Sequence, residues 1–227
     1  FVRSKHLDWY NNENAIKTFR QIADFCNKFQ RVYVVGESLG GSGAIIFSDY
    51  CKNIHRILAF SPQYSALPQF CKWYGPLTPV DGAIEKYVFS DYSTQNAVSK
   101  AVLIYPSLSY EDNLHAKFFQ SEGFNVVYLK TGDHAIARFL KNAPDSNLLM
   151  SALHAMYDDA FAFNKSAFES LLSGVVQTSK KPFVRWIGDM TFKWDVFIDE
   201  PNGEIISAGR KATLSSVCRY SYHQDKD

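Results

Sequence analysis

The sequence predicts an α/β fold with a mostly parallel, doubly wound sheet, because short apolar runs alternate with helical patterns over most of the chain. The apolar runs are continuous rather than alternating, which is typical of strands buried on both faces. A chain of 227 residues, 46% hydrophobic and 21% charged, can bury a sizeable core and has an ordinary globular composition. We therefore expect one main α/β domain with a smaller appendage.

The expected elements follow one another in the order that a parallel sheet requires. They are a strand end at 1–4, a helix at 14–29, a strand at 32–35, a helix at 42–50, strands at 57–60 and 101–105, a helix at 113–122, a strand at 126–129 and a helical stretch at 147–172. Apolar residues at three- and four-residue steps define the first helix. Gly123 is expected to end the helix that precedes it.

Two segments depart from this rhythm. Residues 64–100 are rich in proline, glycine and aromatic side chains, which predicts an insertion that is either a lid over the sheet or an irregular loop packed by its own aromatics. After residue 174 the chain is rich in β-formers, and Pro201-Asn202-Gly203 is a turn signal. We expect an α/β domain over 1–174, with the insertion at 64–100, and a small β-rich appendage over 175–227.

Charge and cysteine usage narrow the partners and the compartment. Lys+Arg 24 against Asp+Glu 23 gives a net charge of +1, so no global field favours nucleic acid. No apolar run approaches the roughly 18–20 residues of a membrane span. Cys26, Cys51, Cys71 and Cys218 lie far apart and lack metal-binding or disulfide spacing. We expect a cytoplasmic protein without a metal ion.

The most informative motif is Gly36-Glu37-Ser38-Leu39-Gly40, which lies between an apolar strand and a helix. In this context Gly-x-Ser-x-Gly predicts a tight turn that lifts the serine hydroxyl clear of the sheet as a nucleophile. The backbone N–H of Leu39, at the start of the helix, is then placed to donate to an oxyanion.

Other interpretations of the glycine-rich turn fit less well. A phosphate-binding P-loop has the pattern Gly-x-x-x-x-Gly-Lys-Ser/Thr. Gly36 and Gly41 have the spacing of its two glycines, but Gly41 is followed by Ser42 rather than lysine. A dinucleotide fingerprint fails at its last position, which is Ile46. A turn that merely begins a helix, without chemistry, is the remaining alternative.

A serine nucleophile needs a base, and His134 is the best-placed histidine. It follows the strand at 126–129 in a loop at the carboxyl end of the sheet, where ligand sites of open α/β sheets lie. His115 and His154 fall in helical patterns, and we expect them at the surface or in packing contacts.

The acid that orients the base is expected in the loop after the strand at 101–105. Asp112 is the first candidate and Glu111 the second, although Asp112 could instead cap the following helix. Asp133, beside the histidine, is expected to be solvated.

These motifs resemble the α/β-hydrolase superfamily, through the elbow at 36–41, Phe60-Ser61-Pro62-Gln63 and Gly132-Asp133-His134. Together with Asp8-Trp9-Tyr10 and the segment at 112–116, they also resemble a bacterial hydrolase-like group associated with surface polysaccharides. The resemblance implies Ser38 as nucleophile, His134 as base, a following acid, Leu39 as oxyanion donor, and a pocket bordered by Gln63. It also implies a second oxyanion donor on a loop that follows an earlier strand, upstream of the elbow. We expect either that this earlier strand precedes Phe1 or that the oxyanion hole is built differently.

The sequence thus predicts a serine esterase that needs no cofactor and acts on a small-molecule, glycan or lipid ester through Ser38, His134 and Asp112. Two alternatives stay open. The same site could transfer the acyl group to a sugar or lipid hydroxyl, or the chain could be a non-catalytic interaction module that keeps the elbow for its fold.

Overall fold

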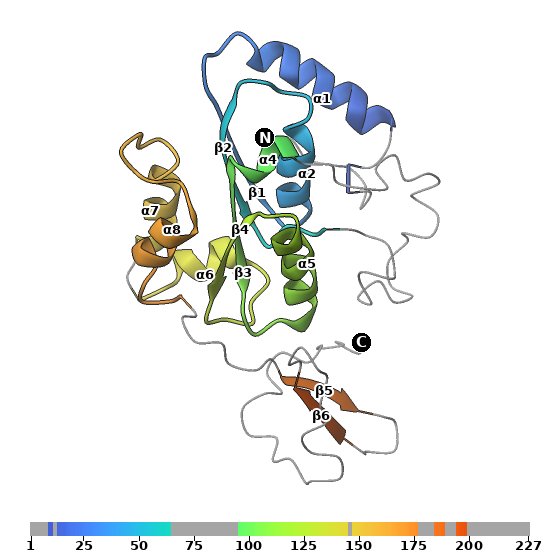
Figure 1. Ribbon diagram of the computed structural model, residues 1–227, viewed down its shortest axis with the longest axis vertical. Coiled ribbons are helices and arrows are strands. Elements are labelled where there is room, and N and C mark those ends of the chain that lie inside the picture. The colour runs from blue at the N-terminus through green and yellow to red at the C-terminus, as the bar shows by residue number, and fades with distance from the viewer. Residues whose placement is uncertain are drawn as a thin grey trace. The chain divides into compact units, whose positions relative to one another are not determined.

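The computed structural model describes residues 9–10, 13–64, 95–144, 147–176, 184–188 and 194–198 (Figure 1). By its contacts the chain divides into two compact units, Phe1–Val176 and Gln177–Asp227. The expected strand end at 1–4 and the Pro201-Asn202-Gly203 turn lie outside the described residues.

The first unit is built on a four-stranded sheet whose strands are all parallel, as predicted. Its order is β1-β2-β3-β4, with bounds Val32–Glu37, Ile54–Phe60, Ala101–Pro106 and Asn125–Leu129. Every residue of β3 and nearly every residue of β2 is buried, because both faces of a parallel sheet are covered. All four strands therefore end at one edge of the sheet.

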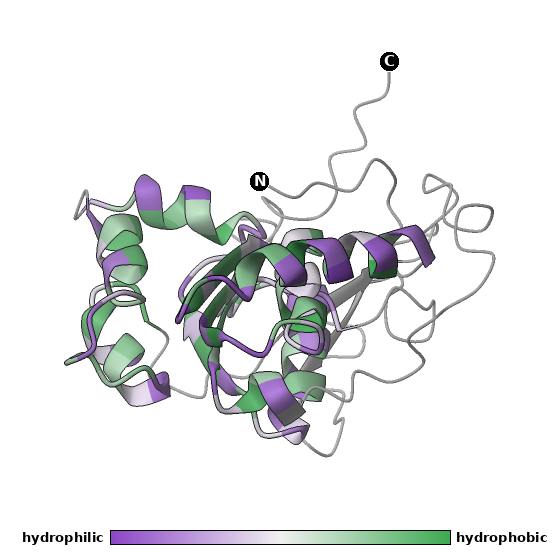
Figure 2. Cartoon of the chain, turned by 90° about the horizontal axis from the view of Figure 1, so that it is seen from above, coloured by the Kyte–Doolittle hydropathy of each residue, from purple (hydrophilic) through white to green (hydrophobic). Residues whose placement is uncertain are grey.

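Helices cover both faces of this sheet (Figure 1). One face carries α1 (Glu13–Cys26), α2 (Leu39–Phe47), α4 (Gln95–Val98) and α5 (Tyr110–Ser121), and the other carries α6 (Ile136–Lys141), α7 (Leu148–His154) and α8 (Lys165–Leu171). Right-handed crossovers that advance in one direction place α2, α4 and α5 on the same face. The helices after β4 close the opposite face, and the strands between the two layers are hydrophobic (Figure 2).

The helical stretch expected at 147–172 contains two helices, α7 and α8, with a non-helical link between them. The guanidinium of Arg56, in β2, donates to the carbonyl oxygens of Ala155 (2.7 Å), Asp158 (2.8 Å) and Phe161 (3.0 Å) in the link between α7 and α8. Carbonyls that turn toward a cation are not available to a continuous helix. A long-range contact therefore interrupts a pattern that is locally helical.

The end of the expected insertion belongs to the core of the first unit. Residues 95–98 form α4, residues 99 and 100 lead from it into β3, and Ala97 is fully buried. The remainder of the insertion, residues 65–94, lies outside the described residues, so the lid stays a prediction.

Described by itself, the second unit contains a two-stranded antiparallel sheet. Strand β5 (Val184–Gly188) pairs with β6 (Trp194–Ile198). None of the helices in the described ranges combines the length and hydropathy needed to cross a membrane.

Candidate active site

The candidate site lies at the carboxyl edge of the parallel sheet. Ser38 follows β1, Ser61 follows β2, Asp112 lies in the first turn of the helix after β3, and His134 follows β4. Since the four strands are parallel and adjacent, their following loops gather at one edge. The structure thereby brings together side chains that are up to 96 residues apart in the chain.

Ser38 sits on a strained turn between β1 and α2. Its φ of 53° and ψ of −123° fall in a region that L-residues rarely adopt. Gly36 permits the turn, because a Cβ atom there would lie 2.1 Å from the carbonyl oxygen of Gly40. A Cβ atom at Gly40, by contrast, would meet nothing within 4 Å.

His134 contacts Ser38 through one ring nitrogen and Asp112 through the other. Its Nε2 lies 2.8 Å from Ser38 Oγ, and its Nδ1 lies 2.7 Å from Asp112 Oδ1. Because an ionised carboxylate only accepts, Nδ1 carries the proton, and Nε2 of the neutral ring accepts from the serine hydroxyl. The side chain of His134 is 30% exposed, so a reactant can approach it from solvent.

Asp112, rather than Glu111, is the acid that reaches the histidine. Ser109 is the N-cap of α5, and its Oγ accepts from the Asp112 backbone N–H at 3.3 Å, so the alternative of Asp112 as the cap is wrong. The helix therefore begins at Tyr110, which turns Asp112 inward, fully buried, and leaves Glu111 exposed. Among the described residues, no group hydrogen-bonds to Asp112 Oδ2.

Opposing effects act on the pKa of His134. Burial by itself lowers this pKa, since it disfavours the charged ring. The hydrogen bond to Asp112 and the negative charges of Asp112, Glu37 and Asp133 raise it, and together they prevail. The pKa of His134 therefore lies above the ordinary histidine value of 6.5, which suits a group that accepts a proton near neutral pH.

Of the two other predicted site residues, Leu39 directly follows Ser38, and Gln63 lies in the loop after β2, where its backbone N–H donates to Ser42 Oγ of α2. Leu39 is the first residue of α2, where backbone N–H groups have no intrahelical acceptor. Gln63 is 4% exposed, and its Oε1 accepts from Trp9 Nε1 at 2.5 Å. With its side-chain oxygen engaged by Trp9, contact of Gln63 with a substrate stays a prediction.

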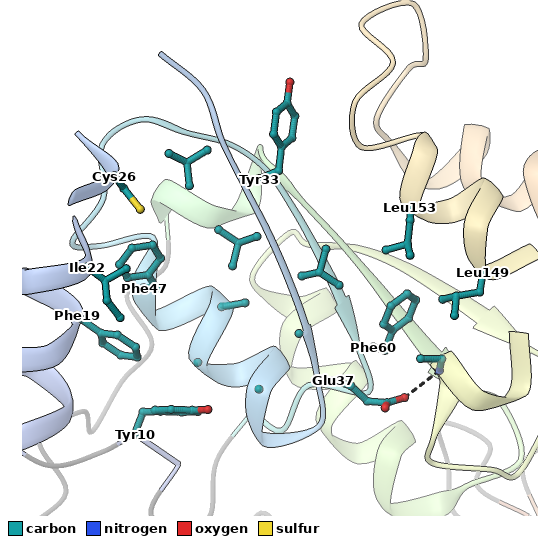
Figure 3. A pocket seen from close by; sticks show the side chains of 18 residues that line it. Tyr10, Phe19, Ile22, Cys26, Tyr33, Glu37, Phe47, Phe60, Leu149 and Leu153 are labelled. Carbon is teal, nitrogen blue, oxygen red and sulfur yellow. Dashed lines mark hydrogen bonds between the residues drawn. The ribbon is translucent and has the colours of Figure 1, made fainter. Parts of the chain in front are cut away.

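Three side chains that the sequence did not mark as site residues hold the loop of His134. Glu37 Oε1 accepts from Ala137 N–H in the first turn of α6 at 2.8 Å (Figure 3), where a negative charge is favourable. Ser61 Oγ donates to the His134 carbonyl at 2.9 Å. Asp133, expected to be solvated, is instead paired with Arg138 at 3.0 Å. Glu37 occupies a variable position of the Gly-x-Ser-x-Gly motif. Its role in holding the start of α6 therefore becomes visible only from its hydrogen bond with Ala137.

The remaining described histidines lie away from Ser38 or are used differently. His154 is exposed at the end of α7, and His55 is 3.8 Å from Asp159. His115, expected at the surface or in packing, is fully buried in α5 three residues after Asp112. That i, i+3 spacing is the signal that could have linked His115 to the site.

A largely apolar groove of about 580 Å³ runs beside β1 (Figure 3). Side chains of α1, α2 and α7 line it, with Val35 exposed on the strand. Its lining includes Gly36, Glu37 and Gly40 but not the three residues of the hydrogen-bonded chain. The groove thus adjoins the elbow without containing the reactive side chains.

Across the part of the chain that the structure describes, no three His, Cys, Asp or Glu side chains gather as metal ligands do. No protein-family model matches this chain, and no curated protein matches its sequence.

Proposed function

We propose that this protein is a serine hydrolase that cleaves a carboxylic ester through Ser38, His134 and Asp112. The observation that carries the proposal is the hydrogen-bonded chain from Ser38 Oγ to His134 Nε2 (2.8 Å) and from His134 Nδ1 to Asp112 Oδ1 (2.7 Å). A nucleophile, a base and an orienting acid in this geometry are the parts that acyl transfer requires. The strained φ of Ser38 supports the proposal, because such strain concentrates at functional sites.

In the proposed reaction, Ser38 Oγ attacks the ester carbonyl carbon as its proton passes to His134 Nε2. Asp112 stabilises the imidazolium, and the Leu39 N–H donates to the oxyanion of the tetrahedral intermediate. The intermediate collapses by breaking the bond to the leaving alkoxide, which takes the proton from His134. Water, deprotonated by the same ring, then releases the acid from the acyl-enzyme and restores Ser38.

We also propose that the fold is of α/β-hydrolase type. The order serine, acid, histidine along the chain supports it, as does the place of each residue after a strand of one parallel sheet. The lid-like insertion at 64–100, the small-molecule, glycan or lipid ester substrate and the cytoplasmic location belong to the same proposal. The free thiols of Cys26 and Cys51 are compatible with a reducing compartment.

Covalent labelling with a fluorophosphonate probe tests the proposed function. We expect the wild-type protein to label on a serine, Ser38→Ala to lose labelling, and His134→Ala to label at least about 100-fold more slowly, because general-base assistance is lost. Ser121→Ala is the matched control, since Ser121 is an exposed serine of α5 that should leave the rate unchanged. Hydrolysis of p-nitrophenyl esters should follow the same order.

A folded wild-type protein that neither labels nor hydrolyses any of these esters would contradict the proposal. That result would favour a non-catalytic module. Labelling that persists in Ser38→Ala would place the nucleophile elsewhere.

A further inference from the structure

His115 is a buried titratable group that the proposed mechanism does not use. It lies on α5 three residues after Asp112, so the two side chains share a face of the helix. Both residues have no exposed surface. A buried imidazole this close to the acid of the site calls for a physical account.

A hydrogen bond defines the protonation of His115. Its Nδ1 accepts from the backbone N–H of Tyr64 at 2.9 Å. A ring nitrogen that accepts carries no proton, so the neutral ring holds its proton on Nε2. His115 thereby ties α5 to residues 61–64, which we call the post-β2 loop.

The post-β2 loop is bonded to the other parts of the site as well. Ser61 Oγ donates to the His134 carbonyl at 2.9 Å. The Gln63 backbone N–H donates to Ser42 Oγ at 2.9 Å, in the helix that follows Ser38. The loop therefore contacts the segments of the nucleophile and the base directly, and it contacts the helix of the acid through His115.

We propose that His115 is a positioning residue of the active site, which holds α5 and Asp112 against the post-β2 loop as a neutral imidazole. This inference rests on the proposed function. Its basis is the Tyr64–His115 hydrogen bond, the burial of His115 and its place beside Asp112.

The charge state of His115 bears on the same role. Among the described residues, the titratable groups that act on His115 are Asp112 on its own helix and His134 from the loop after β4. Burial lowers the pKa of His115 to about 4, and the attraction of Asp112 does not offset it. A protonated His115 would place a second cation beside Asp112 and compete with the His134 imidazolium for that carboxylate. A neutral His115 leaves the carboxylate to His134.

Two variants of similar size separate the hydrogen bond from simple packing. His115→Asn keeps an acceptor near the position of Nδ1, whereas His115→Leu fills the space without one. We expect fluorophosphonate labelling and kcat to fall about 10–100-fold in His115→Leu, with KM nearly unchanged, because the acid and base lose their alignment. In His115→Asn we expect values within about threefold of wild type and the same acid limb of the pH profile, since His134 still sets it.

Two measurements that do not depend on activity accompany the labelling experiment. Circular dichroism checks that each variant is folded, and His115→Gln, whose amide reaches the Nε2 position instead, replaces a Leu variant that does not fold, with the same expected loss. Nitrogen-15 NMR of histidine-labelled wild-type protein should show the Nε2–H tautomer of His115 and no protonation down to about pH 5.

Each contrary result has a distinct meaning. Folded Leu and Asn variants that label equally, whether fast or slowly, would overturn the positioning role, as would an Nδ1–H tautomer. A wild-type protein that shows the expected tautomer but never labels would instead contradict the proposed function, and the positioning role would fall with it.

Discussion

At the scale of single residues, the site depends on a backbone conformation that most residues avoid. Ser38 adopts a φ of 53°, which for a residue with a side chain stores about 1–3 kcal/mol of strain. The close approach of Gly36 to the Gly40 carbonyl maintains the turn. The two glycines of the motif therefore differ: Gly36 has no room for a side chain, whereas Gly40 has room for a methyl group.

Alanine at each glycine tests this difference. Gly36→Ala should lower the free energy of unfolding by about 1–3 kcal/mol or more, because its Cβ would lie 2.1 Å from the Gly40 oxygen. Gly40→Ala should leave it within about 0.5 kcal/mol or raise it, since the new methyl group meets open space in a helix. Urea unfolding of both variants measures the effect, and equal destabilisation would refute the steric role of Gly36.

The pH dependence of the proposed reaction follows from His134. The base must be neutral, so kcat/KM should fall as the pH falls through the pKa of His134, which lies above 6.5. In Asp112→Asn, burial still lowers that pKa while the hydrogen bond to a carboxylate and its charge are lost. The acid limb should then move to lower pH, and the plateau should fall by on the order of 10³–10⁴-fold. An acid limb that Asp112→Asn leaves in place would show that another group sets it.

At the scale of elements, contacts between residues far apart in the chain hold the loops of the candidate site in place. Glu37 joins the elbow to α6, and the post-β2 loop joins α2, α5 and the loop of His134. On the other side of the sheet, Arg56 joins β2 to the link between α7 and α8 and lies 5.1 Å from the Phe163 ring centroid. These cross-links fix helices that are each too short to be stable alone.

Arg56→Met should lower the free energy of unfolding by about 3 kcal/mol. In the wild-type protein the buried guanidinium donates to backbone carbonyl groups of the link between α7 and α8, and in the variant these carbonyl groups lose their donor. Arg31→Met is the matched control. Its ion pair with Asp159 is 2.6 Å long but half-exposed, so we expect a much smaller change than in Arg56→Met. Chemical denaturation compares the two, and similar losses would contradict the role given to Arg56.

At the scale of the whole first unit, two helical layers cover a parallel sheet, and β1 lies at the edge of the described strands. Its sequence is apolar like that of a central strand, yet Val35 is 44% exposed in the groove beside it. The core on either side of the sheet is nevertheless continuous from β1 to β4.

Stability of the whole fold should decline in acid partly through His115. Its folded pKa of about 4 lies below the ordinary 6.5, so the unfolded chain binds a proton first as the pH falls. The stability present above pH 6.5 should fall by about 3 kcal/mol between pH 6.5 and 4. The raised pKa of His134 acts in the opposite sense, adding stability at low pH that is lost as the pH rises through it.

Comparing the wild-type protein with His115→Asn isolates the contribution of His115 to the pH dependence of stability, because both proteins contain His134. The free energy of unfolding, measured by urea titration at pH 7 and pH 4.5, should fall less in His115→Asn than in wild type. An equal fall in both would contradict the buried, neutral state of His115.

Local patterns were sufficient for the α/β class, for the strands and most helices, and for naming Ser38, His134 and Asp112 as candidates. Continuous apolar runs, helical periodicity and glycine at a tight turn are properties of neighbouring residues, so they can be recognised without knowing the fold. The start of the helix after β3 was predicted at residue 113, whereas α5 begins at Tyr110.

Contacts through space decided the rest. The cap at Ser109 determined that Asp112 and not Glu111 faces His134. Arg56 bonds the link that divides the helical stretch expected at 147–172, and Tyr64 gave His115 its tautomer. Each of these outcomes depends on a hydrogen bond to a specific atom, most of them between residues distant in the chain. Such a bond has no signature in the local sequence, since only the packed sheet brings its two ends together.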